Sequence, residues 1–344
     1  MAHEVEGRIM SASGINAWHG LANTIPGQAT LLQAIELGGL DWQVSVHPSS
    51  VIGDGFVTAT NEFMNIVRST DHKILGQCKG RYTAVQNLRL FEMLEEIIHA
   101  SEGAAVWETA GSLRGGQVVF GSIRLGAWDA VKEDPHHDFL SVFGSHDGSG
   151  KVRFVAGTVR VVCANTMRVS LREAADQFAV KHTKRFEEKM RSAAEFLKIN
   201  LNETKFLEMA IKSFVSKPLT NEITSYVLDR AIPLPRVVIP EGKGLLDAVI
   251  DMTTEEVAGR AMTIAVNKRE RVKELITCGI GQDIQGVEGT CYSLWNAFTE
   301  YADHESTVRP HKGRSEADSR VDSLLFGSAA ELKERAYVAL QAVC

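Results

Sequence analysis

The sequence is short of cysteine, and its cysteines form no pattern that would hold a metal or a set of disulfides. The five are Cys78, Cys163, Cys278, Cys291 and Cys344, and no Cys-X-X-Cys pair occurs among them. An odd, scattered set is typical of reduced thiols in a cytoplasm, not of a disulfide framework or a zinc site. We therefore predict a cytoplasmic location.

Long hydrophobic runs are missing as well. No apolar stretch approaches the length of about 20 residues that a membrane-spanning helix needs. The first six residues, Met-Ala-His-Glu-Val-Glu, lack the basic stretch and apolar run of a signal peptide. Neither a membrane partner nor export is expected.

Positive charge is in short supply. The chain has 37 Lys and Arg against 43 Asp and Glu, a formal net charge of −6. This balance excludes a uniformly basic coat, so that any nucleic-acid site has to be a local basic patch. With 344 residues, 44% of them hydrophobic, the chain is nevertheless long enough to form a sizeable core.

The first half of the chain has the spacing of paired strands. Residues 106–109 and 117–120 flank an Arg-Gly-Gly turn at 114–116, where glycine adopts positive φ at low cost. A second strand pair is predicted at 139–143 and 151–163. Short connections allow only antiparallel pairing, because parallel strands need a long crossover. We predict a curved antiparallel sheet backed by helices.

Helical spacing occurs on both sides of these strands. Thr30 is a candidate cap for a short helix, and another helix is predicted after Gln86. From Asn165 onward the pattern is helical, with Asn165 or Ser170 as a cap. Breaker-rich residues between 232 and 242 mark the best boundary. The fold predicted is therefore α+β, with an α+β domain at 1–232 and a mainly helical region at 233–344.

The Gly-Ser-Gly-Lys sequence at 148–151 imitates a phosphate-binding loop without meeting its requirements. Such a loop needs a glycine six residues before the lysine and a Ser or Thr after it. Those positions hold Ser145 and Val152, and the segment leads into a predicted strand. A hairpin turn explains the glycines, so we expect neither nucleotide hydrolysis nor a bound cofactor.

Two groups of residues are weighed as metal ligands. The first group is His136, His137, His146 and Asp147 in neighbouring predicted loops, where solvated side chains are the more common explanation. In the second group, Glu300 and His304 are one helical turn apart, beside Asp303. A carboxylate and an imidazole at this spacing are able to bind a metal or to exchange protons. A structural hydrogen-bond network on a polar helix face is the alternative.

The segment from Lys151 to Arg191 is the most basic in the chain. Its cations can form a stripe that follows a phosphate backbone, with Trp42, Tyr82 and Trp107 as stacking faces for bases. The alternative is a solvated helix face, with Arg160 paired inside the core. The candidate nucleic-acid-binding residues, with the turn residue Arg114 added, are Arg114, Lys151, Arg153, Arg160, Asn165, Arg168, Lys181, Lys184 and Arg185.

Short motifs through most of the chain carry a resemblance to a known family. Val159–Thr166 resembles the signature junction of the phage- and plasmid-like proteins called domain of unknown function 932. One small departure is Met167, where an aliphatic Leu is usual. Further matches, in order, are Trp-His-Gly at 18–20, Gly-Leu-Asp-Trp at 39–42, Tyr-Thr-Ala-Val-Gln-Asn at 82–87, Ala-Gly-Ser-Leu-Arg-Gly-Gly at 110–116, Ser-His-Asp-Gly-Ser-Gly at 145–150, Lys-His-Thr at 181–183 and the segment 296–304.

The resemblance implies a bacteriophage or plasmid origin, hence a bacterial host cytoplasm, but brings no established activity. The predicted layout also resembles, at the level of fold, the ring-forming single-strand annealing proteins. We therefore predict a non-enzymatic DNA-recombination protein, a homo-oligomer that binds and anneals single-stranded DNA without nucleotide. Two alternatives stay open: a metal-dependent enzyme acting on nucleic acid through Glu300, Asp303 and His304, and a host-directed counter-defence protein.

Overall fold

A computed structural model was analysed, and it describes most of the chain. The described residues are 9–11, 22–24, 29–79, 82–101, 104–148, 151–160, 165–168, 180–181, 202–235, 252–308, 316, 319–320, 323–324 and 327–344. The chain divides into two compact units. The first comprises Met1–Trp128, Pro135–Leu207 and Val308–Asp322, and the second comprises Asp129–Asp134, Glu208–Thr307 and Ser323–Cys344.

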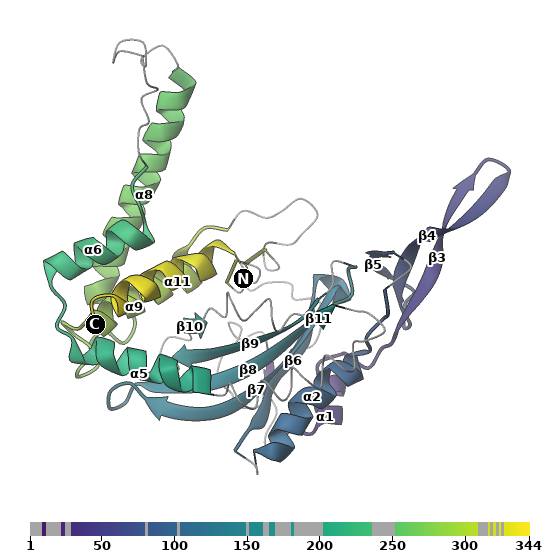
Figure 1. Ribbon diagram of the computed structural model, residues 1–344, viewed down its shortest axis with the longest axis horizontal. Coiled ribbons are helices and arrows are strands. Elements are labelled where there is room, and N and C mark those ends of the chain that lie inside the picture. Colours follow the sequence, from purple (N-terminus) through teal and green to yellow (C-terminus); the bar gives the residue numbers. More distant parts are fainter. Residues whose placement is uncertain are drawn as a thin grey trace. The chain divides into compact units, whose positions relative to one another are not determined.

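The first unit is built on a large sheet, as the sequence predicts. Within the described residues its strand order is β10-β9-β8-β7-β6-β1-β2, and β11 also pairs with β9. Neighbours β6 and β7, β8 and β9, and β9 and β10 are antiparallel, whereas β1 and β2 are parallel. The long strands bend along their length (Figure 1). The bounds are β1 Ile9–Ser11, β2 Ala22–Thr24, β6 Val106–Leu113, β7 Val118–Asp129, β8 Pro135–Ser145, β9 Lys151–Arg160, β10 Asn165–Arg168 and β11 Val180–Lys181.

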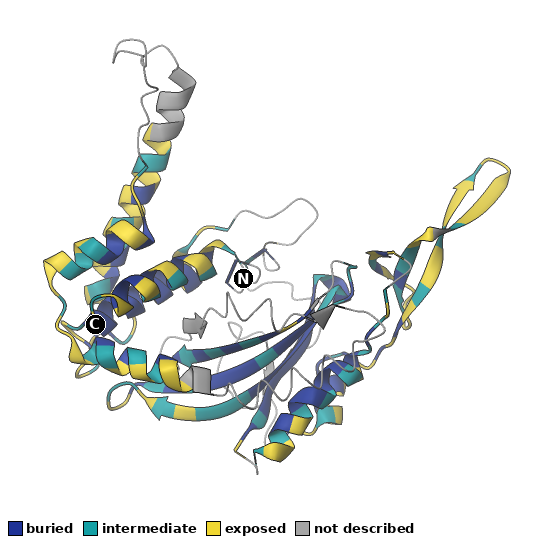
Figure 2. Cartoon of the chain, in the orientation of Figure 1, coloured by how far each residue is buried: buried dark blue, intermediate teal, exposed yellow. Residues whose placement is uncertain are grey.

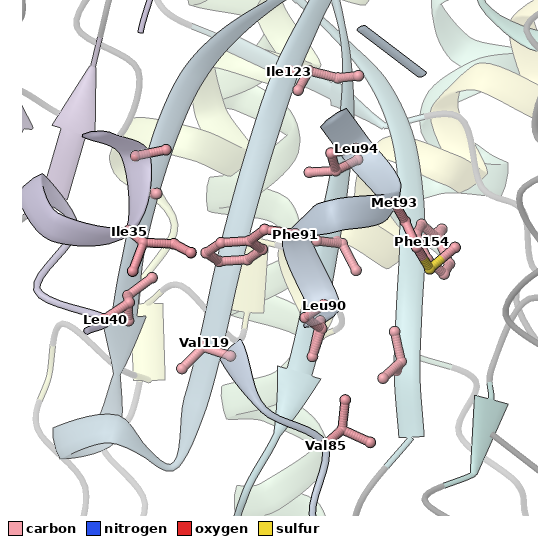
Figure 3. Packing of buried hydrophobic residues seen from close by; sticks show 14 of the residues in the cluster. Ile35, Leu40, Val85, Leu90, Phe91, Met93, Leu94, Val119, Ile123 and Phe154 are labelled. Atoms are coloured by element: carbon pink, nitrogen blue, oxygen red, sulfur yellow. The ribbon is translucent and has the colours of Figure 1, made fainter. Parts of the chain in front are cut away.

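Two helices cover one face of this sheet and form its core with it. Helix α1, Leu31–Leu37, begins at Thr30, whose hydroxyl accepts from the Gln33 amide in a capping box, as predicted. Helix α2, Asn87–Ala100, begins after Gln86. Apolar side chains of α2 meet inward-facing residues of β7, β8 and β9 (Figure 3). The cluster includes Leu90, Phe91, Leu94, Val119, Ile123, Leu140, Val142 and Phe154.

A second, smaller sheet precedes α2. Its strands are β3, Val44–Gly53, β4, Phe56–Arg68, and β5, Ile74–Cys78, in the order β3-β4-β5. All pairs are antiparallel, and the β3–β4 register shifts between Pro48 and Ser49. Strand β5 pairs only with residues Met64 to Val67 of β4.

The second unit is mainly helical, in agreement with the predicted C-terminal region. Its helices are α5, Asn202–Ser216, α6, Asn221–Ala231, α8, Met252–Cys278, α9, Cys291–Glu300, and α11, Ser328–Gln341. A π-helical turn, Tyr301–Glu305, continues α9. The predicted domain boundary at 232–233 lies after α6 and inside this unit. The division into domains at that point stays a prediction. None of the helices that the structure describes is both long and apolar enough to cross a membrane.

The second unit also contains the six-residue turn Asp129–Asp134, which lies between β7 and β8 in the sequence. Inside it the Ala130 amide donates to the Asp134 carbonyl at 3.2 Å. The Tyr292 hydroxyl donates to Asp134 Oδ2 at 2.7 Å, and both side chains are buried. This bond joins residues 158 positions apart in the chain.

Two local predictions are wrong. Asn165 begins strand β10, opposite Arg160, and is therefore not a helix cap, because its backbone pairs with β9. Ser170, the other proposed cap, lies outside the described residues. The adjacent histidines His136 and His137 lie in strand β8, not in a loop, and His136 is completely buried.

Candidate nucleic-acid interface

Strand β9 organises the basic segment that the sequence singles out. One edge of β9 pairs with β8, while β10 and β11 both pair with β9 residues. Six of the nine candidate residues lie on these three strands: Lys151, Arg153 and Arg160 on β9, Asn165 and Arg168 on β10, and Lys181 on β11. Lys184 and Arg185 lie outside the described residues.

The register places two lysine positions opposite each other. Lys181 of β11 is the direct partner of Lys151 at the start of β9. Directly opposite residues of an antiparallel pair have Cβ atoms about 4.5–5.5 Å apart, and like charges there are destabilising. Arg153, which is exposed, is two residues further along β9 and therefore on the same face as Lys151.

Burial alternates along β9 and separates its two faces. Val152, Phe154 and Ala156 are buried in the core beneath α2. Arg153, Val155 and Gly157 point to the other face and are less buried. Arg153 is thus an exposed arginine on the face of β9 that points away from this core.

Arg124 of β7 is a further cation of this face, and it is not among the residues predicted from sequence. Its guanidinium is about one-third exposed and lies 3.8 Å from the buried carboxylate of Glu108. Burial, with a smaller contribution from the charge of Arg124, lowers the pKa of His137 on β8. No spacing rule reveals Arg124 in the sequence, because only the β7–β8 pairing brings it beside His137.

Arg160 lies at the other extreme, wholly buried. Its direct partner on β8 is the buried His136, which stacks on Trp128 with ring centroids 4.4 Å apart. Next along the ladder, the Thr158 hydroxyl donates to Asp138 Oδ1 at 2.6 Å. Asp138 Oδ1 also accepts from Trp128 Nε1 at 3.1 Å. This surrounding matches the alternative of an arginine held inside the core.

The aromatic residues predicted as stacking faces are not surface platforms. Trp42 and Trp107 are both buried, and that part of the prediction is wrong. Trp42 Nε1 donates to the Gly39 carbonyl at 3.0 Å, and Trp107 Nε1 donates to Glu95 Oε2 at 2.6 Å. Tyr82 is half-buried, and burial raises the pKa of its hydroxyl. Both indole rings are part of the core, because each ring is packed there and each indole N–H has an acceptor.

Three of the short motifs converge on one buried polar cluster. The Asn87 amide donates to the carbonyls of Leu40 and Trp42 at 3.0 and 3.2 Å. His146 Nε2 is 2.8 Å from Asn87 Oδ1, and because that oxygen accepts, the imidazole donates. The ring of His146 also meets Trp42 edge-on at 5.4 Å. The motifs at 39–42, 82–87 and 145–150 thus build the scaffold.

The hairpin turn belongs to the same cluster. The Arg68 guanidinium donates to the Gly115 carbonyl at 3.2 Å and lies 5.5 Å from the Trp42 ring centre. Arg114, at the start of the turn, has a φ of 55°, a conformation that side-chain-bearing residues rarely adopt. It is half-buried, so Arg114 presents less charge to solvent than Arg153 does.

The proposed acidic face of α9 is also in the interior. All ten residues of α9 are buried, because α8 and α11 pack against it. Glu300 Oε2 accepts from the Ile280 amide at 2.9 Å, and Asp303 forms a 2.6 Å ion pair with Lys333. His304 is exposed. These contacts correspond to the structural hydrogen-bond network kept as the alternative.

The described part of the chain offers no cluster of metal ligands. No group of three or more His, Cys, Asp or Glu side chains there is placed to hold a metal ion. The Asp147 turn is held locally instead, since the Ser145 hydroxyl donates to Asp147 Oδ1. Gly148, which the imitation of a phosphate loop includes, has a φ of 84° in a turn that leads to β9.

Comparison with protein families matches residues 74–325 of this chain to the family described as Domain of unknown function (DUF932). The match covers well over half of the chain. This protein belongs to the DUF932 family. No curated protein and no solved structure matches it.

The matched region includes both the basic strands around β9 and the acidic residues of the α9 segment. The DUF932 region contains β9 with its neighbours and the α9 segment with Glu300 and Asp303. Strands β3 and β4 precede it. The description of the family names no activity, so function follows from the residues themselves.

Proposed function

We propose that this DUF932 protein binds single-stranded DNA during recombination in phage- or plasmid-carrying bacteria, and anneals it without nucleotide hydrolysis. The binding surface is the face of β9 that carries Arg153, together with the paired strand β11, with Arg153, Lys151 and Lys181 as phosphate contacts. Binding requires no metal or nucleotide, because the attraction is between cations and the phosphate backbone. An annealing protein must also leave the base edges accessible, which contacts confined to phosphates allow.

The observation that carries the proposal is the direct pairing of Lys181 with Lys151 beside the exposed Arg153. Concentrated like charge in a protein of net charge −6 costs stability unless an anion compensates for it. A phosphate backbone supplies anions at regular intervals. Binding then offsets the unfavourable free energy of the two like charges. The β9–β11 pair is for this reason a better candidate than a scattered set of surface lysines.

The test is fluorescence anisotropy of a labelled single-stranded oligonucleotide titrated with purified protein over a series of salt concentrations. We expect binding that weakens steeply with salt, and we expect Arg153→Gln to weaken binding several-fold at low salt. Loss of one phosphate contact should also reduce the slope of log K against log salt by about 0.7.

Arg89→Gln is the matched control. Arg89 is a half-exposed arginine of α2, on the helix that covers the other face of the sheet, and its partner Glu92 is one turn away. The two variants have the same net charge. A loss of DNA affinity that is confined to Arg153→Gln therefore assigns binding to the face of β9 that carries Arg153. Absence of binding at low salt, or equal losses in both variants, would contradict the proposal.

The same protein sample distinguishes the two alternatives. Turnover of nucleic acid that depends on Mg²⁺ or Mn²⁺ and disappears in Glu300→Ala would favour the metal-dependent enzyme. Since Glu300 is buried on the Ile280 amide, a thermal melt must accompany that variant. If neither DNA binding nor turnover is detected, a host-directed partner is the function to pursue by affinity capture.

A further inference from the structure

The β3–β4 hairpin extends beyond every strand that supports it. Its outer part, here called the distal ribbon, pairs Ser49–Gly53 with Phe56–Thr60. Among the described residues, β5 pairs with β4 only from Met64 to Val67, so the distal ribbon is a two-stranded structure with two open edges. Figure 2 shows this end of the hairpin as almost entirely exposed.

Four of the exposed side chains of the distal ribbon are large and apolar. Ile52 is 79% exposed and Val57 is 70% exposed, and these two are direct cross-strand partners. Val51 and Phe56 are 60% and 55% exposed. Successive residues of a strand point to opposite faces, so both faces of the ribbon carry apolar groups. Isolated two-stranded hairpins are at best marginally stable in water, and this one gains no intramolecular cover from the described chain.

The composition of the ribbon excludes a phosphate ligand. Between residues 49 and 60 there is no Lys or Arg, and the single charge is the carboxylate of Asp54 at the turn. A nucleic acid would meet apolar side chains and one repelling charge. The ribbon is therefore suited to protein, and to a surface that is itself uncharged.

The edge of β3 lacks the features by which proteins normally block strand addition. Edge strands are usually protected by Lys, Pro, a bulge or a covering element. Here Pro48 and the register shift after it protect the base of the strand, but Ser49–Gly53 has neither a proline nor a charge. Its peptide groups are open to another strand, a mode of association in which main-chain bonds give the affinity.

We propose that the distal ribbon associates with the distal ribbon of a second copy of this chain, through antiparallel pairing of the two β3 edges about a two-fold axis. Such a contact is self-complementary, because each copy presents the same uncharged edge to the other. Pairing buries Val51 and Ile52 of both copies without burying a charge. A contact of this size is smaller than the roughly 800 Å² per partner of standard interfaces, so the association is reversible.

This inference does not rest on the proposed function, and its test contains no DNA. Sedimentation velocity of the full chain is measured over a range of concentrations up to about 100 µM. We expect the sedimentation coefficient to rise with concentration as a dimer forms. Ile52→Lys places a charge on the edge strand and should weaken dimerisation at least about tenfold.

Leu32→Lys is the matched control, because Leu32 on α1 is 69% exposed and the change in charge is the same. It should dimerise as the parent does. Both positions are exposed, so both variants should keep the far-UV circular dichroism of the parent. A parent that stays monomeric throughout, or an Ile52→Lys variant that associates as the parent does, would overturn the proposal, whatever the DNA titrations give.

Discussion

Single buried polar side chains of the first unit form hydrogen bonds between segments that are far apart in the sequence. Asn87 is the clearest case, because its one amide satisfies two carbonyls before strand β3 and the imidazole that follows β8. Buried polar groups are tolerated when their hydrogen bonds are satisfied, and then they specify one arrangement of the chain. The asparagine thus fixes which turn lies beside the start of α2.

His137 gives the protein a predictable sensitivity to acid. Burial lowers its pKa below the usual 6.5, so the unfolded chain takes up a proton more readily than the folded one. The contribution of this group is complete above pH 6.5 and is lost as the pH falls from there toward the folded pKa. Replacing it by a neutral side chain, His137→Gln, should flatten the dependence of unfolding free energy on pH below 6.5.

The measurement is urea denaturation at several pH values between 7.5 and 5, roughly the range in which an imidazole titrates. The quantity of interest is the difference in slope between parent and variant, because carboxylates contribute equally to both. Parallel curves would show that His137 titrates in the same way in the folded and unfolded chains.

At the scale of elements, close approach between strand β5 and the turn after β8 makes glycine necessary. Gly148 and Gly55 both have a φ of 84°, so an alanine bears the same backbone strain at either position. A Cβ on Gly148 would come within 1.9 Å of the Gln77 carbonyl oxygen, whereas Gly55 has open space around it. We expect Gly55→Ala to cost about 1 kcal/mol and Gly148→Ala to cost about 1–3 kcal/mol more.

Thermal or urea unfolding of the two variants side by side measures the difference. Equal losses would mean that backbone strain alone matters and that β5 yields to the added methyl group. A larger loss in Gly148→Ala would assign the turn a packing role, consistent with a hairpin turn and not with a phosphate-binding loop.

The ion pair between α11 and the π-helical turn is a second element-scale feature. Lys333 and Asp303 are each about 2% exposed, with 2.6 Å between Nζ and Oδ1. Removing one partner leaves the other charge buried, so Lys333→Ala should destabilise the protein by about 3–5 kcal/mol. In Lys333→Met/Asp303→Leu both charges are absent, and much of that stability should return. Urea denaturation measures both variants, and an unchanged midpoint in Lys333→Ala would refute the argument.

For the whole molecule, the sequence was sufficient for the layout but not for the surroundings of its charges. Hairpins, caps and helical periodicity are local, so the antiparallel sheet, the Thr30 cap and the helical C-terminal region are all confirmed. The burial of Trp42 and of α9 is not predicted from sequence, and that of Arg160 is left open. Burial depends on which segments cover these residues. Arg124 is missed for the same reason, since strand pairing decides its neighbours.

The bond between Tyr292 and Asp134 has a consequence for how the chain is made. The turn that carries Asp134 leaves the ribosome 158 residues before its partner does. At synthesis rates of about 5–20 residues per second, that interval is roughly 8–30 s. During this time the Tyr292 hydroxyl is not yet available to the carboxylate of Asp134. Strands β7 and β8 have to hold their own register until the second unit emerges.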